Sequence, residues 1–226
     1  MLIRPGVSTP ERDRVLTTVA TAITDRRADG FLRVGVDGPD GSGKTILADE
    51  LAGTLHARGT AVVRVSIDDF HHVRAIRHRR GRDSPDGFWL DSYDYDRFRT
   101  DVLTPFGPGG TGRYRPAAHD VATDALLNPE PVQAPPGAVL IVDGIFLHRD
   151  ELAGAWDLSL FLDVPFTETA RRMAARDGTP PDPSHPGMRR YVEGQRRYFT
   201  TCTPHRRATW LLDNTNPATP HLHPPR

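Results

Sequence analysis

Segments whose apolar residues have helical spacing alternate along this chain with apolar, β-branched segments that are typical of strands. Apolar residues at helical spacing predict helices over about 9–28, 44–58, 165–176 and 188–202, with a weaker helical pattern over 91–103. The first of these helices follows a capping box formed by Ser8 and Glu11. Runs of β-branched and apolar residues predict strands at 31–38, 60–67, 137–146, 158–164 and 208–213.

The order of these elements indicates the fold class. Strands alternate with helices, and the run over 137–146 is apolar enough for a strand that is buried on both faces. This order is typical of an α/β domain with a parallel sheet and helices on both faces. The 226 residues suit one domain, with or without an attached lid. Proline and glycine cluster at 105–116, 129–137, 178–187 and 217–225, which predicts loops and a tail.

A glycine-rich segment joins the first predicted strand to the second predicted helix. Residues 38–45 read GPDGSGKT and satisfy the P-loop pattern G-x-x-x-x-G-K-[ST] in the strand–loop–helix context that it requires. Glycines let backbone N–H groups turn toward phosphate oxygens, and the helix N-terminus adds partial positive charge. The predicted nucleotide-binding residues are Gly38, Asp40, Gly41, Ser42, Gly43, Lys44 and Thr45.

Two of these residues have more specific expected roles. Lys44 is expected to reach the β- and γ-phosphates, and the Thr45 hydroxyl is expected to bind Mg²⁺. The alternative is a glycine-rich turn that only happens to precede a lysine. The register of strand, motif and helix favours the phosphate-binding interpretation.

Composition limits the partners of this protein. The 29 basic residues balance the 29 acidic residues, so no overall field attracts nucleic acid or an anionic membrane, and we expect neither as a partner. Cys202 is the only cysteine, which fits a reducing cytoplasm. No apolar window is long enough for a signal peptide or a membrane span, so the expected location is cytoplasmic.

Carboxylates follow two predicted strands, at the sheet edge where α/β proteins bind ligands. Asp68 and Asp69 end the strand at 60–67, where a carboxylate can orient an acceptor hydroxyl and take its proton. Alternatively, either residue only caps a short helix. Asp143 ends a buried strand and therefore needs a partner such as Mg²⁺. The alternative for Asp143 is a turn-forming Asp-Gly pair.

Several classes of nucleotide-binding protein are not supported. The chain has no N-K-x-D guanine signature and no segment that resembles an ABC signature. It is also too short for most motor architectures. These observations argue against a GTPase switch and leave kinase chemistry as the best match.

The motifs together resemble a known family. GPDGSGKT, SIDDF, SYD, VDGIF and RRMAARD occur in the order and spacing that is typical of the uridine kinase and phosphoribulokinase group of small-molecule kinases, over roughly residues 31–217. The resemblance implies a P-loop NTPase fold of the mononucleotide-kinase type, with ATP and Mg²⁺. It implies one kinase domain over 1–226, with an N-terminal helix at 9–28, an acceptor-binding insertion at 71–136, a lid at 171–190 and a tail at 217–226. Family relatives are often homo-oligomers, although this sequence shows no interface signature.

The resemblance also assigns roles to single residues. It implies that Asp68 is the catalytic aspartate and that Asp94, with Tyr93 beside it, binds the acceptor. Tyr114 and His119 keep the five-residue spacing of the pair that lines the base in uridine kinases. Tyr93 is alternatively a core residue, and His119 is alternatively an ordinary exposed loop histidine.

Arginines precede a segment that is rich in proline and glycine. Arg171, Arg172 and Arg176 lie on the predicted helix at 165–176, and the last two share a face. The following segment cannot form a helix or a strand, which predicts a mobile lid. Closure of such a lid would exclude water and neutralise the transferring group, so we expect Arg172 and Arg176 in catalysis and Arg171 at the nucleotide. The alternative is a helix solvated by its arginines.

The sequence departs from the family pattern at three places. Uridine kinases commonly carry a glutamine in a Q-Y-x-x-x-x-x-P stretch, and Arg197 occupies that position here, as a substrate-binding candidate. Gln195 is two residues away. Asp143 replaces the glutamate of many relatives, and the lid is unusually rich in proline. The missing glutamine leaves the base preference open.

We therefore expect an ATP-dependent phosphotransferase that acts on a small-molecule hydroxyl acceptor. A nucleoside such as uridine or cytidine, phosphorylated at its 5′-hydroxyl, is the leading acceptor. A pantothenate-like alcohol or a specialised metabolite is the alternative acceptor. A nucleotide-sensing protein without catalysis is the alternative function, although a sensor needs neither Asp68 nor Asp94.

Overall fold

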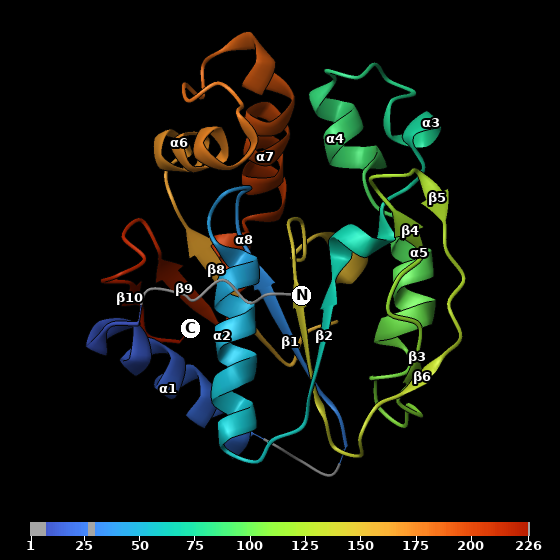
Figure 1. Ribbon diagram of the computed structural model, residues 1–226, viewed down its shortest axis with the longest axis vertical. Coiled ribbons are helices and arrows are strands. Elements are labelled where there is room, and N and C mark those ends of the chain that lie inside the picture. Colours follow the sequence, from blue (N-terminus) through green and yellow to red (C-terminus); the bar gives the residue numbers. More distant parts are fainter. Residues whose placement is uncertain (1–7, 27–29, 226) are drawn as a thin grey trace.

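A six-stranded sheet lies at the centre of the protein. The computed structural model describes residues 8–26 and 30–225. The strands run in the order β10-β9-β8-β1-β7-β2, and all neighbours are parallel except β10, which is antiparallel to β9 (Figure 1). They are β1 (Leu32–Asp37), β2 (Val62–Ser66), β7 (Val139–Asp143), β8 (Leu158–Asp163), β9 (Trp210–Asp213) and β10 (His221–Leu222).

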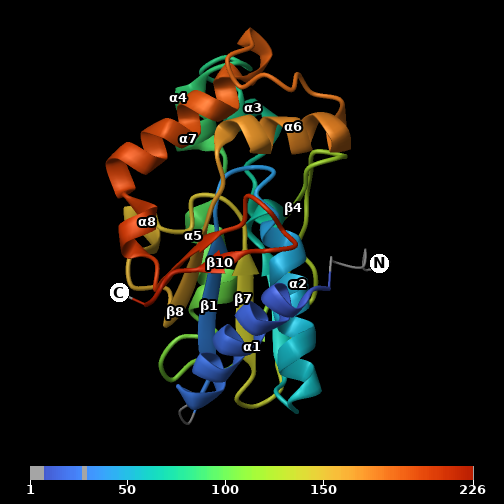
Figure 2. The same cartoon turned by 90° about the vertical axis from the view of Figure 1, so that its left-hand side faces the viewer.

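Helices cover both faces of this sheet, as the strand–helix alternation predicts. Helices α1 (Pro10–Asp25) and α2 (Lys44–Ala57) pack on one face, with Leu16, Ile23 and Leu51 in the core that they share with β1 and β8. The other face packs against Phe98 of α5 (Tyr95–Phe98) and Tyr198 of α7 (Arg189–Cys202). Figure 2 shows α1 and α2 lying together against the strands.

Two helical projections stand above the carboxyl ends of the central strands (Figure 1). One consists of α6 (Phe166–Asp177) and the upper part of α7, joined through a short 3₁₀ turn at Pro186–Met188. The other consists of α3 (Arg74–Arg77) and α4 (Pro85–Asp91). The shorter elements are the 3₁₀ turns Ile67–Phe70 and Asp150–Leu152, the π-helical turn Arg99–Leu103, α8 (Pro204–Arg207), and the strand pairs β3 (Arg113–Tyr114) with β6 (Val132–Gln133) and β4 (His119–Asp120) with β5 (Ala125–Leu126).

The structure corrects the sequence prediction where elements are very short. The predicted tail at 217–226 contains β10, which forms because Leu222 pairs with Leu212 and packs against the core beside α1. The expected loops at 105–116 and 129–137 contain β3 and β6, and α4 was not predicted. Two-residue strands show no periodicity, so a sequence pattern cannot find them. The predicted end of the first helix falls on 27–29, outside the described residues.

Two further findings concern the whole described part of the chain. None of the helices in residues 8–26 and 30–225 is long and apolar enough to cross a membrane. Cys202 is a free thiol that is buried at the end of α7. The expected cytoplasmic location stays a prediction.

Candidate active site

The loop at 38–45 connects β1 to α2, and its conformation requires glycine. Gly41 and Gly43 have φ values of +79° and +95°, in the left-handed region that favours glycine. A Cβ on Gly41 would lie only 2.7 Å from the carbonyl oxygen of Thr169 on α6. The loop therefore has the geometry that its sequence motif predicts, directly before a helix N-terminus.

Two polar side chains of this loop fit a triphosphate. Lys44 is buried, and its Nζ donates a hydrogen bond of 2.8 Å to the Pro39 carbonyl and lies 4.0 Å from Oδ1 of Asp40. Oγ of Ser42 is buried and has no hydrogen-bond partner within the described ranges. Phosphate oxygens would satisfy both groups, because a buried hydroxyl needs a partner and an ammonium attracts an anion.

Thr45 and Asp143 form the oxygen pair that the sequence predicts for Mg²⁺. Oγ1 of Thr45 donates a hydrogen bond of 2.6 Å to Oδ2 of Asp143. Oδ1 of the same carboxylate accepts a bond of 2.9 Å from Arg64, which lies within a strand pattern and was not predicted. Mg²⁺ usually takes one or two protein oxygens together with phosphate and water, so the pair fits such an ion beside a triphosphate. The residues that the structure describes contain no group of three His, Cys, Asp or Glu that could hold a metal.

Asp68 and Asp69 follow β2 but do not cap the 3₁₀ turn that contains them. Oγ of Ser66 has that role, because it accepts a hydrogen bond of 3.3 Å from the Asp68 N–H. Oδ1 of Asp68 instead accepts a bond of 2.7 Å from the hydroxyl of Tyr93. Tyr93 is buried and packs edge-on against Phe146, so it is at once a core residue and the partner of Asp68.

The side-chain carboxyl of Asp69 has an unusually high pKa. Burial raises the pKa of its carboxyl to about 6, and the negative charges of Asp68 and Asp143 add to the effect. The side chain nevertheless lies at an exposed edge of the site. The carboxyl of Asp69 thus keeps its proton to a higher pH than an ordinary aspartic acid does.

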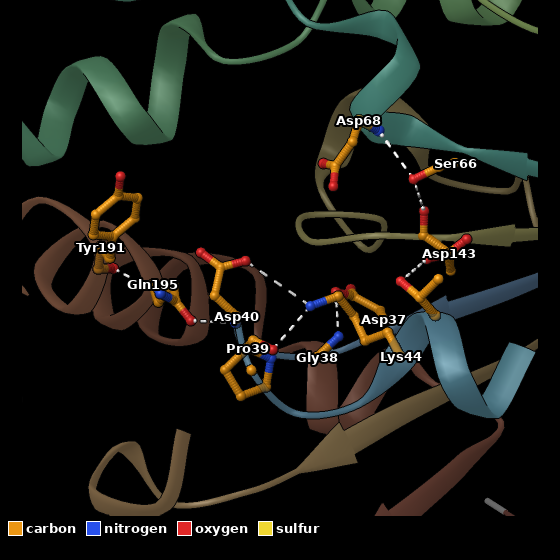
Figure 3. A network of polar contacts seen from close by, with 12 residues as sticks. Asp37, Gly38, Pro39, Asp40, Lys44, Ser66, Asp68, Asp143, Tyr191 and Gln195 are labelled. Carbon is orange, nitrogen blue, oxygen red and sulfur yellow. Dashed lines mark hydrogen bonds and ion pairs between the residues drawn. The ribbon is translucent and has the colours of Figure 1, made fainter. Parts of the chain in front are cut away.

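Asp40 extends from the P-loop toward Asp68 (Figure 3). Burial raises the pKa of its carboxyl; Lys44 opposes this effect, and the negative charge of Asp68 increases it. Arg176 is a further cation near this carboxylate. The P-loop, the end of β2 and the end of α6 thereby bring Asp40, Asp68 and Arg176 to one cavity.

This cavity has a volume of about 660 Å³ and lies between the two helical projections. We call it the Asp68 cavity. Its walls come from the P-loop, the turn after β2, helices α3 and α4, and the segment from α6 to α7. Its lining includes Asp40, Asp68, Tyr93, Arg176, Thr179 and Arg190.

The three predicted lid arginines have different surroundings in the structure. Arg176 lines the Asp68 cavity and is paired with Asp177. Arg172 does not line this cavity, because its guanidinium donates to the carbonyls of Asn214 and Thr215 at 2.9 and 2.8 Å. Arg171 is an exposed ion-pair partner of Glu168. Only one of the three arginines therefore lies where the transferring group was expected.

A second, smaller cavity also borders the P-loop. It has a volume of about 270 Å³ and is lined by Gly41, Ile46, Arg172 and Asn214, among others. We call it the Asn214 cavity. The side-chain amide of Asn214 donates a hydrogen bond of 2.7 Å to the Ser42 carbonyl, so the loop after β9 is tied directly to the P-loop.

Four predicted acceptor residues do not line the Asp68 cavity. Asp94 caps α5 by accepting from the Arg97 N–H at 2.9 Å. The Tyr114 ring packs against Phe106, because β3 turns it toward the core. His119 is buried rather than exposed, and its Nε2 lies 3.1 Å from Asp124. Arg197 is paired with Asp86 on α4. The five-residue spacing of Tyr114 and His119 therefore does not place them together at this cavity.

Two residues of α7 that no sequence pattern assigned to the site contact the P-loop region. Oε1 of Gln195 accepts a hydrogen bond of 3.0 Å from the Asp40 N–H, and its Nε2 donates to the Tyr191 carbonyl (Figure 3). The hydroxyl of Tyr198 donates to the buried carboxylate of Asp37 at the end of β1. Gln195 lies two residues from the family's glutamine position, and no pattern in the sequence connects it to a loop 155 residues away.

Asp37 is the centre of a buried polar network. Besides Tyr198, it contacts the Gly38 N–H at 2.7 Å and Nδ1 of His148 at 2.7 Å. Nε2 of His148 lies 2.9 Å from Oγ of Ser159 on β8. The network fixes the start of the P-loop against the sheet and α7.

Solved structures share this fold. A possible uridine kinase from Bacillus stearothermophilus matches with a TM-score of 0.70 and 23% identity, over 88% of this chain and 97% of that chain. Phosphoribulokinase from Rhodobacter spheroides matches with a TM-score of 0.57 and 15% identity, over 84% and 75%. D-glycerate 3-kinase from Cryptococcus neoformans matches with a TM-score of 0.51 and 14% identity, over 85% and 88%.

These likenesses confirm the predicted α/β fold of P-loop kinase structures, with a mostly parallel sheet. Because the sequence identities are low, these structural matches support the fold alone. No family model and no curated protein sequence matches this chain.

Proposed function

We propose that this protein is an ATP-dependent phosphotransferase that phosphorylates a hydroxyl group of a small molecule. One observation carries the proposal: the carboxylate of Asp68 and the P-loop residue Asp40 line the same cavity. A triphosphate on the P-loop would therefore point its terminal phosphate toward a carboxylate that can accept a proton. The likeness to three kinase structures supports the same reaction type.

The chain's own residues divide the work of this reaction. Bound Mg²⁺ and ATP would supply the electrophilic phosphoryl group, with Thr45 and Asp143 as the oxygen ligands for the ion. Lys44 would leave its contact with the Pro39 carbonyl and hold the phosphates. Asp68 would orient the acceptor hydroxyl and take its proton while its other oxygen stays bonded to Tyr93.

Arg176 would supply positive charge at the transferring group. Its guanidinium is near both Asp40 and Asp68, and it borders the Asp68 cavity and the Asn214 cavity. Because the transition state of phosphoryl transfer is loose, most of the acceleration should come from such positioning and charge rather than from the base. Arg172 would instead border the nucleotide base in the Asn214 cavity.

The acceptor is the open part of this proposal. The three similar structures are described as a possible uridine kinase, a phosphoribulokinase and a D-glycerate 3-kinase, so the likeness does not choose an acceptor. A nucleoside 5′-hydroxyl stays a candidate, but Tyr114 and His119 lie outside the Asp68 cavity. A nucleotide sensor is less well supported, because it would not need Asp68 facing the P-loop.

A panel of hydroxyl acceptors, incubated with ATP and Mg²⁺ and analysed by mass spectrometry, tests the proposal. We expect one acceptor class to gain a phosphoryl group, and we expect the product to disappear with the Lys44→Ala variant. ATP binding without transfer to any acceptor in a broad panel would favour the sensor.

A further inference from the structure

The two ends of the Asp68 cavity differ in their balance of charge. The P-loop end contains the carboxylates of Asp40 and Asp68 together with Arg176. The end beside α3 and α4 contains three arginines and one carboxylate, namely Arg77, Arg82, Arg190 and Asp83. A small molecule that spans this cavity would meet mainly carboxylates at one end and mainly guanidinium groups at the other.

Arg190 is the most informative of these arginines because it is buried and has no carboxylate partner among the described residues. The residue is 9% exposed, and its guanidinium carbon lies 5.6 Å from the centre of the Phe88 ring. Its Nη1 donates to the backbone carbonyl of Arg82. In the part of the chain that the structure describes, no carboxylate oxygen comes within 4.0 Å of it. A buried cation without an anion is costly, so this site gains from an external one.

The groups around Arg190 carry both signs of charge, but none of them forms an ion pair with it. Arg77 is paired with Asp124 at 3.5 Å, outside the cavity lining. Arg82 is exposed and forms no ion pair within residues 8–26 and 30–225. Burial lowers the pKa of the Arg190 guanidinium; Tyr191 and Asp83 oppose this effect, and the positive charges of Arg77 and Arg82 add to it.

The lid contributes an unused polar group to the same cavity. Oγ1 of Thr179 is buried and has no hydrogen-bond partner in the described ranges. Thr179 also lines the Asp68 cavity, in the segment that leads to α7. A hydroxyl donor and unpaired guanidinium groups that line one cavity are groups that bind carboxylate or phosphate oxygens.

We propose that the acceptor is a small alcohol that carries an anionic group, a carboxylate or a phosphate monoester, at the end away from its reacting hydroxyl. The anionic group would bind Arg190 and Arg82, and the hydroxyl would face Asp68. The inference rests on the proposed phosphotransferase function and specifies its substrate class. In the reaction, the bond between the terminal phosphorus and the diphosphate oxygen breaks, a new bond forms to the acceptor oxygen, and the hydroxyl proton goes to Asp68.

Acceptor pairs that differ only in the anionic group give the first test. The pairs are D-glycerate with glycerol and ribose 5-phosphate with ribose, with uridine as a neutral nucleoside. We expect kcat/KM for the preferred anionic acceptor to exceed that for its neutral partner by about 100-fold, because two lost charge-assisted hydrogen bonds have that effect. The two pairs distinguish a carboxylate from a phosphate requirement. Equal or higher kcat/KM with the neutral members, uridine included, would overturn the inference and leave the phosphotransferase function standing.

Variants at two neighbouring arginines give the second test. Arg190→Gln and Arg82→Gln should each raise KM for the anionic acceptor by about 10-fold while KM for ATP stays unchanged. Arg189→Gln is the matched control, since Arg189 is exposed and does not line the cavity. If Arg190→Gln raises KM for ATP and not for the acceptor, the arginine serves the donor and the inference is wrong. Arg82→Gln keeps the test valid if Arg190→Gln does not fold, because Arg82 is exposed.

Binding to the nucleotide-free protein separates the two proposals. D-glycerate, ribose 5-phosphate and inorganic phosphate are titrated in a calorimeter without ATP. Saturable binding that is lost in Arg190→Gln and kept in Arg189→Gln would support the anion site even if no transfer from ATP occurs. Absence of binding, or binding that Arg190→Gln leaves unchanged, would overturn the anion site whatever the transfer assay shows.

Discussion

The hydroxyl of Tyr93 donates a hydrogen bond of 2.7 Å to Oδ1 of Asp68. Tyr93 is buried among aromatic side chains, whereas Asp68 is exposed at the edge of the cavity. The packed tyrosine therefore fixes the rotation of the exposed carboxylate. This contact gives Asp68 a defined orientation before any ligand binds.

Tyr93→Phe should lower kcat by about 10-fold and leave KM for ATP unchanged, because one hydrogen bond to a charged group is lost while the ring remains packed. Steady-state kinetics with the best acceptor measures both constants. Tyr95→Phe is the matched control, since this neighbouring, half-buried tyrosine makes no hydrogen bond to Asp68. Equal losses in the two variants would show that Tyr93 acts only through packing.

Asp68→Asn should lower kcat by about 100-fold or more with little change in ATP affinity, as expected when a general base is removed. Asp69→Asn should have a smaller effect, since Asp69 lacks the bond to Tyr93. Single-turnover kinetics and a separate nucleotide-binding titration measure the two quantities. A larger loss in Asp69→Asn would assign the base to that residue instead.

Asp69 should make the protein less stable as the pH rises from about 4 to 6. Its pKa is about 6 in the folded state, above the usual 3.8, so in this window the folded state holds a proton that the unfolded state has lost. Asp69→Asn should therefore raise Tm at pH 8 relative to wild type by about 2 °C, because water screens part of the penalty at this exposed position. Thermal unfolding at pH 5 and pH 8 should show the larger gain at pH 8.

The control for this measurement is Asp96→Asn, which removes an exposed carboxylate whose one ion pair among the described residues is with Arg99. It should change Tm by the same small amount at both pH values. A gain in Asp69→Asn that does not depend on pH would contradict the predicted titration.

Lys44 is the single lysine of the chain, which allows a direct chemical test of the P-loop. An amine-reactive acylating reagent should modify one side chain, and ATP with Mg²⁺ should protect it, because Nζ would then bind phosphate. Peptide mass mapping measures the modified fraction. Lys44→Ala should remove transfer with every acceptor, and near wild-type turnover at saturating ATP would exclude the assigned role.

The segment at 177–188 should exchange amide hydrogens quickly in the free protein and slowly with an ATP analogue plus acceptor. It joins α6 to α7, consists largely of proline, glycine and short polar residues, and forms only the turn at Pro186–Met188. Hydrogen exchange of its peptides measures the change. Equal protection with and without ligands would indicate a static loop.

The sequence predicted the parts of this protein that depend on local patterns. Strand and helix periods predicted the sheet of β1, β2, β7, β8 and β9, and a complete motif predicted the P-loop. Strand ends predicted that Asp68 would lie at the carboxyl edge of the sheet, because parallel strands align their ends.

The rest depends on contacts between distant segments. Gln195 reaches Asp40 across 155 positions, and His148 reaches Asp37 across 111 positions. Neither contact has a spacing rule, since tertiary packing decides it. The same limit explains why the spacing of Tyr114 and His119 did not indicate their surroundings: β3 and β4 are two-residue strands in separate pairs.

Helix α7 holds the P-loop at two points, through Tyr198 at Asp37 and through Gln195 at Asp40. The two bonds are one turn apart on the helix, so together they prevent the helix from rotating about either one of them. A lid that opens by tilting all of α7 would have to break both bonds and would distort the phosphate loop each time. Opening of the lid therefore costs the least free energy when the bending is confined to the stretch before Tyr191. Substrate could then enter the cavity without a change in the conformation of the P-loop that binds the nucleotide.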